Sequence, residues 1–216
     1  PELYIASGSL LVFILLSFLF LMMGGRRNKA EKTTEKTAQS AGQGPSLLFS
    51  EETGLCREEH LLPKLKFEIE KAASFDQDLV LVLINIDNLY QLSREQIIYT
   101  KIAKILLSDF IYRDLIFEYK NTGYAVIIPD IDLNRGIKLL KTFRDKLATS
   151  KIINQKLELS IGLSSRNGRL ISENILIKEA RLALKKANSH PDTDLYAFKV
   201  DPEKYRNYIS KKYIEL

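Results

Sequence analysis

DLIFEYKNTGYAVIIP, residues 114–129, is the stretch of this sequence that most directly decides its fold. Its two flanks, Asp114–Tyr119 and Tyr124–Ile128, are rich in aliphatic and aromatic residues, which favours short strands. The triplet Asn121-Thr122-Gly123 between them suits a hairpin turn, because asparagine and glycine tolerate positive φ. The stretch therefore predicts a β-hairpin.

Helical and strand patterns alternate on both sides of this hairpin. Leu79–Ile86 is an unbroken aliphatic run, which is typical of a strand buried on both faces. Apolar residues at helical spacing predict several helices. The order indicates an α/β (α+β) fold in which helices pack on a central mixed sheet. The remaining predicted elements are helices over Glu58–Ala73, Arg94–Phe110, Leu133–Ala148 and Ile171–Ala187, and strands over Lys156–Leu163 and Leu195–Lys199.

The first 25 residues predict a transmembrane anchor. Leu3–Gly25 contains no charged residue and is about as long as the ~30 Å hydrocarbon layer requires of a helix. A cleaved signal peptide would need a basic segment before a shorter apolar run, whereas here Arg26 and Arg27 follow it. By the positive-inside rule, the rest of the chain is expected in the cytoplasm, at the inner membrane of a bacterium.

Three further segments follow the anchor. Residues 26–46 are polar and predict a flexible linker, and residues 47–200 carry the alternating pattern of one domain. Residues 201–216 form a basic, aromatic tail, predicted to be helical, that presents an interaction surface to a membrane or a partner, or packs on the domain itself. The aromatic and aliphatic residues of this tail at helical spacing are Tyr205, Tyr208, Ile209 and Tyr213.

Composition excludes some classes of function. The net charge of +5 is spread over the whole chain of 216 residues. A nucleic-acid-binding protein would concentrate its basic residues on one face, so no nucleic-acid partner is predicted. Cys56 is the single cysteine, which rules out an internal disulfide and suits a reducing compartment.

Five strings, in order and at the right separations, resemble the GGDEF family of diguanylate cyclases. Together they cover about residues 50–199. The resemblance implies a nucleotidyl-cyclase-like sheet flanked by helices. The strings are Thr53-Gly54-Leu55, Ile84-Asn85-Ile86-Asp87, Tyr119–Pro129, Ser160-Ile161-Gly162-Leu163 and Ala180–Ala187.

Active members of that family join two GTP molecules into cyclic di-GMP with the help of divalent metal, a reaction that needs hard oxygen ligands. The resemblance places Asn85 where a metal-binding aspartate belongs and leaves Asp87 as the residual carboxylate. The signature aligns with Lys120-Asn121-Thr122-Gly123-Tyr124, so two glycines and both acidic residues are replaced. We therefore predict no catalytic residues, no cofactor and no metal.

The remaining family positions are also altered. Tyr90 stands where a lysine near the phosphates is usual, and Asn188 and Asp192 align approximately with basic residues after the last helix. At the product-inhibition motif, Asp114 is in place, but Ile111 occupies the position of the arginine. High-affinity dinucleotide binding there is therefore not expected.

These observations predict a membrane-anchored, catalytically inactive GGDEF-like domain that acts as a scaffold or adaptor for a protein partner of unknown identity. The alternative is a regulatory domain that binds GTP or cyclic di-GMP without turnover, and the third reading is an active cyclase. A homodimer is compatible with the fold but not required. Asp87 is interpreted as the cap of a strand-end turn, and Lys120, Lys185 and Lys186 as solvated side chains.

Overall fold

The computed structural model describes residues 48–150, 156–190, 193–201 and 203. The predicted anchor, the linker up to residue 46 and the aromatic residues of the tail (Tyr205, Tyr208, Ile209 and Tyr213) lie outside the described residues. Within those residues, no helix has the length and apolar character needed to cross a membrane.

Residues Ser46–Leu216 form one compact unit built on a five-stranded sheet. The strand order is β2-β3-β1-β4-β5, in which all neighbours are antiparallel except β4 and β5. This is the mixed sheet that the sequence predicts. The strands are β1 (Leu79–Ile86), β2 (Ile116–Tyr119), β3 (Gly123–Pro129), β4 (Leu159–Ser165) and β5 (Leu195–Ala197).

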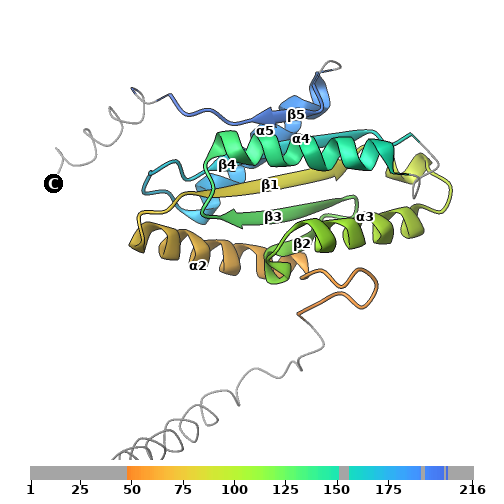
Figure 1. Cartoon of the computed structure of the whole chain (residues 1–216), viewed down its shortest axis with the longest axis horizontal. Coiled ribbons are helices and arrows are strands. Elements are labelled where there is room, and N and C mark those ends of the chain that lie inside the picture. The colour runs from red at the N-terminus through yellow and green to blue at the C-terminus, as the bar shows by residue number, and fades with distance from the viewer. Residues whose placement is uncertain (1–47, 151–155, 191–192, 202, 204–216) are drawn as a thin grey trace, which may run out of the picture. The chain divides into compact units, whose positions relative to one another are not determined.

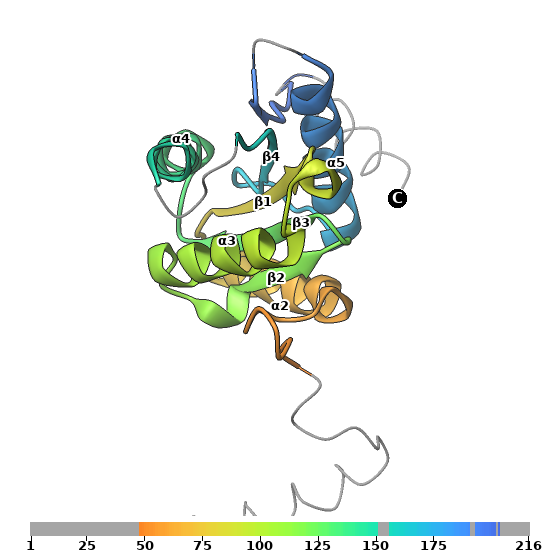
Figure 2. The ribbon, with the colours of Figure 1, turned by 90° about the vertical axis from the view of Figure 1, so that its right-hand side faces the viewer.

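Four α-helices cover the two faces of the sheet. Helices α3 and α4 pack on one face, and α2 and α5 pack on the other (Figure 1). The view in Figure 2 shows α4 and α5 on opposite sides of β1 and β4. The helices are α2 (Leu61–Ser74), α3 (Glu95–Asp109), α4 (Leu133–Thr149) and α5 (Glu173–Ser189), with 3₁₀ turns η2 (Glu58–His60), η3 (Leu89–Gln91) and η4 (Arg113–Leu115).

Strand β1 is the centre of both cores. Alternate side chains point to opposite faces of a strand, so Val80, Val82 and Ile84 join the core under α3 and α4. Leu79, Leu81 and Leu83 join the core under α2 and α5. All six are fully buried, which confirms a strand buried on both faces.

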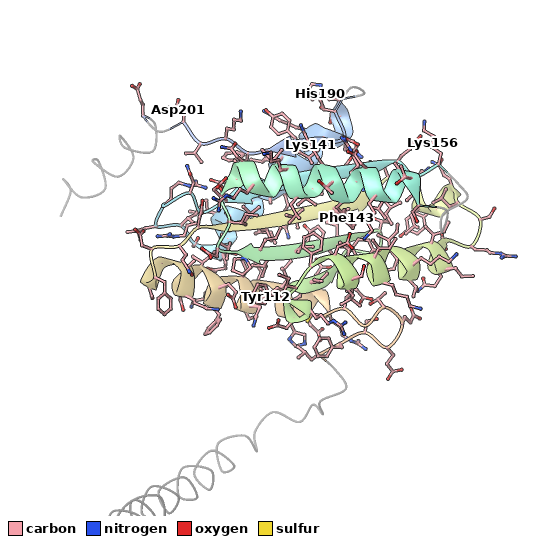
Figure 3. All side chains as sticks on the ribbon, in the orientation of Figure 1. Tyr112, Lys141, Phe143, Lys156, His190 and Asp201 are labelled. Carbon is pink, nitrogen blue, oxygen red and sulfur yellow. The ribbon has the colours of Figure 1, made fainter. Side chains whose placement is uncertain are left out.

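Helix α4 shows how the first core is closed. Its Phe143 is directed towards the sheet and α3 (Figure 3), and its ring meets that of Phe110 edge-on at 5.9 Å. Lys141, two residues earlier on the same helix, is exposed to solvent. The helical period therefore separates the apolar face from the basic one.

Several predicted elements begin later than expected. Strand β4 begins at Leu159 instead of Lys156, and helix α5 begins at Glu173 instead of Ile171. The starts of α2 and β2 also differ. Residues Glu58–His60 form η2, and α2 begins only at Leu61. Proline has no backbone N–H, so a helix starting at Glu58 would lack one of its interior hydrogen bonds at Pro63. In a helix that starts at Leu61, Pro63 lies in the first turn, where the backbone N–H groups have no partner within the helix. Likewise Asp114 lies in η4, and strand β2 begins at Ile116.

The hairpin is confirmed, but its glycine has a different purpose from the predicted one. Tyr119 pairs with Gly123, so the loop consists of residues 120–122, and Lys120 carries the positive φ of 50°. Gly123 opens β3 opposite Asn85 of β1. A Cβ atom on Gly123 would lie 2.2 Å from the carbonyl oxygen of Ile84, so this glycine allows close packing of backbones.

Candidate functional site

An open pocket of about 530 Å³ lies beyond the end of β1. It is bounded by the end of β1, the β2–β3 hairpin, β4 and α5. Five of the candidate residues that the resemblance singles out line this pocket, although they are far apart in the sequence: Asn85, Asp87, Lys120, Thr122 and Asn188. The pocket is lined by Asn85, Asp87, Tyr119, Lys120, Thr122, Ser160, Arg181, Leu184, Lys185 and Asn188.

Asn85, which the resemblance aligns with a metal-binding aspartate, has both ends of its amide engaged. Its Oδ1 accepts a hydrogen bond of 2.6 Å from Oγ1 of Thr122, and its Nδ2 donates one of 2.6 Å to Oδ1 of Asp87. A neutral amide oxygen is a weaker ligand for a hard cation than a carboxylate. The position therefore holds the hairpin against β1 instead of presenting a charge.

Asp87 is the carboxylate that remains, and it joins three elements. Its Oδ1 accepts from Nδ2 of Asn85 and from Nδ2 of Asn188 on α5 at 2.7 Å, and its Oδ2 accepts from Oγ of Ser160 on β4 at 2.6 Å. Its backbone N–H donates to the carbonyl of Glu158 at 2.8 Å. The carboxylate thus ties β1, β4 and α5 together, which is more than a local turn cap.

Metal ligands are scarce around this pocket. Within the described residues, no three or more His, Cys, Asp or Glu side chains come together in a way that would hold a metal ion. A cation bound at Asp87 would have to displace donors that already occupy both carboxylate oxygens. The pocket offers amides, hydroxyls and one carboxylate, and both oxygens of that carboxylate already accept hydrogen bonds. This is a poor match for Mg²⁺, which proteins usually hold through one or two free carboxylates together with waters and substrate phosphates.

The hairpin tip contributes a cation to the pocket. The Nζ atom of Lys120 lies 5.5 Å from the ring centroid of Tyr119, and the backbone N–H of Lys120 donates to Oε2 of Glu58 at 2.7 Å. The interpretation of Lys120 as a merely solvated side chain is therefore incomplete. Its backbone is fixed, and its ammonium group lies on an aromatic face at the pocket wall.

Helix α5 contributes two more cations that the sequence reasoning missed. Arg181 donates from Nε to Oη of Tyr119 at 2.8 Å, and Lys185 lines the same pocket. Lys185 is exposed, as expected of a solvated helix residue, and in addition it lines this pocket. Lys186 next to it instead donates to Oη of Tyr196 at 3.3 Å. The available signal was the spacing of Arg181, Lys185 and Asn188, which places them on one helix face.

Tyr124, the aromatic residue of the signature, is a packing residue. Its ring stacks on Tyr99 with centroids 4.6 Å apart. Its hydroxyl donates to the carbonyl of Tyr99 at 2.7 Å, and the hydroxyl of Tyr99 donates to the carbonyl of Gly123 at 2.8 Å. Burial raises the pKa of both phenols, so they stay protonated as donors. The pair locks the hairpin to α3.

At the inhibition motif, Oδ2 of Asp114 is paired with Nζ of Lys64 from α2 at 2.9 Å. Ile111, at the arginine position, is 89% exposed. The neighbouring Cys56 is buried, and burial, followed by the charge of Asp114, raises its pKa to about 11. A protonated, buried thiol is unreactive, so Cys56 is a core residue.

Comparisons by sequence identify no relative. No family model matches the chain, and no curated protein matches it significantly. Comparisons by structure do identify relatives of the fold, all of them at low identity.

Three solved structures illustrate the likeness. The GGDEF domain of DgcB from Caulobacter crescentus, in complex with c-di-GMP, has a TM-score of 0.63 at 13% identity and covers 74% of this chain and 98% of its own. The active GGEEF domain of a diguanylate cyclase from Vibrio cholerae has a TM-score of 0.60 at 16% identity, with coverages of 68% and 99%. The diguanylate cyclase SiaD from Pseudomonas aeruginosa, in complex with its activator SiaC, has a TM-score of 0.59 at 18% identity, with coverages of 77% and 66%. The described domain therefore has the GGDEF fold.

Proposed function

We propose that this protein is a catalytically inactive GGDEF-like domain, anchored by residues 1–25 in the inner membrane of a bacterium, that acts by binding a protein partner in the cytoplasm. In this role the fold serves as a scaffold or adaptor. The metal-assisted transfer of phosphoryl groups, for which active cyclases use the same fold, is absent.

The observation that carries the proposal is the state of the metal-ligand positions. The resemblance places metal ligands at Asn85, Thr122 and Gly123, none of which has a carboxylate, and the Asp87 carboxylate accepts three hydrogen bonds from neutral donors. Metal ions neutralise the charge that develops in phosphoryl transfer, and without them the reaction loses its main source of catalysis.

The backbone also disfavours a return of the lost glutamate. At Gly123 a side chain of any kind would meet the carbonyl oxygen of Ile84. Replacing Gly123 by Glu would therefore require the hairpin to move away from β1 before a carboxylate could enter the pocket. The close packing of the hairpin backbone against β1 therefore leaves no room for a side chain at position 123.

Two observations support a protein partner. The SiaD structure is of a cyclase of this fold bound to a protein activator. On this chain, the loop between α3 and β2 exposes apolar side chains, with Ile111 at 89% and Tyr112 at 52% exposure (Tyr112 is labelled in Figure 3). Ile111 is the most exposed large apolar side chain of the described residues, and adjoining exposed apolar groups of this kind can form part of an interaction surface.

The first test measures turnover. Residues 46–216 have their own sheet and two buried cores, so we expect them to fold without the first 45 residues. We expect this fragment, incubated with GTP and Mg²⁺ or Mn²⁺, to yield no cyclic di-GMP by chromatography. The active Vibrio cholerae domain serves as the positive control. Product formed by a folded sample would overturn the proposal.

The second test addresses partner binding with the full chain in its membrane. Crosslinking followed by mass spectrometry should recover a partner that is lost from the double variant Ile111→Asp/Tyr112→Ala. Residues 1–45 alone, in the same membrane, serve as the control for contacts made by the anchor. Recovery of the same proteins by that control would contradict a role for the domain.

A second candidate function is a regulatory domain that binds GTP or cyclic di-GMP without turnover. It is favoured by one observation, the three cations Lys120, Arg181 and Lys185 that line the pocket. Calorimetric titration of residues 46–216 with each nucleotide, with and without Mn²⁺, tests it. The absence of heat from a folded sample would eliminate it.

A further inference from the structure

The lining of the pocket beyond β1 carries a net positive charge, whereas a site that binds a metal cation needs a negative one. Three cationic side chains, Lys120, Arg181 and Lys185, line it together with a single carboxylate, that of Asp87. The net formal charge of the lining is therefore positive. A divalent cation would be repelled there, and an anion would be attracted.

None of these three cations forms an ion pair with another described residue. Within the described residues, the ion pairs of lysine and arginine are formed by other side chains, on α2, on α4 and around β4. A second pocket, of about 330 Å³ between α4 and β4, makes the contrast clear. There Arg144 faces Asp194 at 2.8 Å, so its charge is already matched.

The cations come from two different elements that hold each other in place. Tyr119 is almost fully buried, and its hydroxyl accepts the hydrogen bond from Nε of Arg181. Its ring lies 5.9 Å from the Arg181 guanidinium and 5.5 Å from Nζ of Lys120. One rigid aromatic side chain thus positions a cation from α5 and a cation from the hairpin on the same pocket wall. The terminal nitrogens of Arg181 form no hydrogen bond with the described residues, and they are suited to bidentate contact with an oxyanion.

We propose that this pocket binds the phosphate or diphosphate group of a small molecule without a divalent metal ion. Phosphate carries close to two negative charges at neutral pH and several acceptor oxygens, which match two lysines and one arginine. The pocket volume of about 530 Å³ is in the usual range for small-molecule sites. The inference deepens the second candidate function, and it is independent of the scaffold proposal.

The test is a calorimetric titration of residues 46–216 with inorganic pyrophosphate, in low salt and with EDTA to remove divalent metal. We expect binding that weakens as salt is added, because the attraction is between partly exposed charges. Inorganic phosphate, in a parallel titration, should bind more weakly than pyrophosphate, because it carries fewer charges. No binding of either ligand to a folded sample would overturn the proposal.

Single variants locate the site. Arg181→Ala, Lys185→Ala and Lys120→Ala should each weaken pyrophosphate binding about tenfold. Lys186→Ala is the matched control, because Lys186 is adjacent on the same helix but contacts Tyr196 instead of the pocket. Its affinity should be unchanged. An equal loss in Lys186→Ala would show that the helix attracts anions non-specifically and would contradict a site. The charge reversal Lys185→Glu should abolish binding if the site is correct.

Two further titrations, one with Mg²⁺ added and one with GTP, separate this inference from the functions proposed above. Binding that appears only after Mg²⁺ is added would refute the metal-free site, whatever the cyclase assay shows. GTP should bind no more tightly than pyrophosphate if the phosphates carry recognition. A much tighter GTP complex that is insensitive to Arg181→Ala and Lys185→Ala would place the site elsewhere and refute the inference. Cyclic di-GMP formation in the separate assay bears only on the inactivity of the domain.

Discussion

Two carboxylates connect strand β4 to helix α5, and they do so by different means. In the middle part of α5, Glu179 accepts from Oγ of Ser164 at 2.6 Å and from both terminal nitrogens of Arg169 at 2.7 and 2.8 Å. Near its end, Asp87 accepts from Ser160 and from Asn188. The first cluster pairs charge with charge, whereas the second satisfies a charge with neutral donors.

The difference follows from burial. Glu179 and Arg169 are 8% and 7% exposed, while Asp87 is exposed at the pocket rim. A charge removed from water needs a partner, and a charge near water does not. Substitutions in the buried cluster should therefore lower the stability of the fold strongly, whereas substitutions around the pocket should lower it much less. This is the region where three cations and a single carboxylate line the pocket.

The largest expected effect is that of Glu179→Ala, which would leave the Arg169 guanidinium buried without its carboxylate. We expect the free energy of unfolding to fall by about 3–5 kcal/mol, measured by denaturant unfolding of residues 46–216. Glu70→Ala is the control, because Glu70 is 65% exposed and lies 4.0 Å from Lys66. It should change stability by about 0.5 kcal/mol at most. Equal losses of stability in the two variants would show that burial does not decide how much these carboxylates contribute.

A somewhat smaller effect is expected at Gly162, which lies on β4 between the two clusters. A Cβ atom there would meet backbone atoms of α5, at 2.3 Å from N of Leu184, so Gly162→Ala should destabilise by about 1–3 kcal/mol. Gly168→Ala, with φ of +69° and no atom within 4 Å, measures backbone strain alone. It should cost about 1 kcal/mol. Thermal unfolding that gives the opposite order would show that α5 can move away from β4.

The pocket cluster should tolerate change better. Asp87→Asn removes a charge but keeps the shape of the side chain, and we expect a loss of stability of about 1 kcal/mol. Pyrophosphate should bind several-fold more tightly to this variant, because the only carboxylate of the lining is gone. A drop in stability as large as that of Glu179→Ala would show that both clusters are structural. Unchanged pyrophosphate affinity would place the anion away from Asp87.

The smallest effect is expected at Asp114, an exposed carboxylate outside both clusters that is paired with Lys64. Asp114→Ala should change the free energy of unfolding by about 0.2–1 kcal/mol. It should also lower the pKa of Cys56 from about 11, because the charge of Asp114 is the second cause of its elevation after burial.

The sign of the pH effect at Cys56 follows from the direction of its shift. A pKa raised above the ordinary value of 9.0 stabilises the folded state below pH 9, and this contribution is lost as the pH rises through about 11. Unfolding curves at pH 8 and above 10 should therefore differ less in Asp114→Ala than in the original chain. An identical pH dependence would show that Asp114 does not act on the thiol.

Parts of the molecule could be predicted from sequence because their signals are local. The aliphatic run Leu79–Ile86 is a strand to the residue, and α4 begins at Leu133 as predicted. Its start is marked by Asp132, whose carboxylate accepts from the backbone N–H of Arg135. The beginnings of α2, β2, β4 and α5 were predicted too early. For α2 and β2 the reason is that each is preceded by a 3₁₀ turn, which is hard to tell from the start of the following element in sequence.

The candidate site was predicted only in part. The resemblance brought Asn85, Asp87 and the hairpin residues to attention, and they do meet at one pocket. The place of Arg181 and Lys185 at this pocket was not predicted, since on a helix surface a cation that faces a pocket and one that faces water look alike in sequence. Which of the two it is depends on what packs opposite, here Tyr119 from the hairpin.

The sequence by itself determined the order of helices and strands, the two-faced burial of β1 and the absence of carboxylates at Asn85, Thr122 and Gly123. These features depend on residue type and on periodicity along the chain. Only the tertiary structure decided that Asp87 is occupied by donors from β4 and α5, that Gly123 is fixed by the carbonyl of Ile84, and that three cations share one pocket. Such contacts join residues far apart in the chain, and their distances are set by how the sheet and its helices pack.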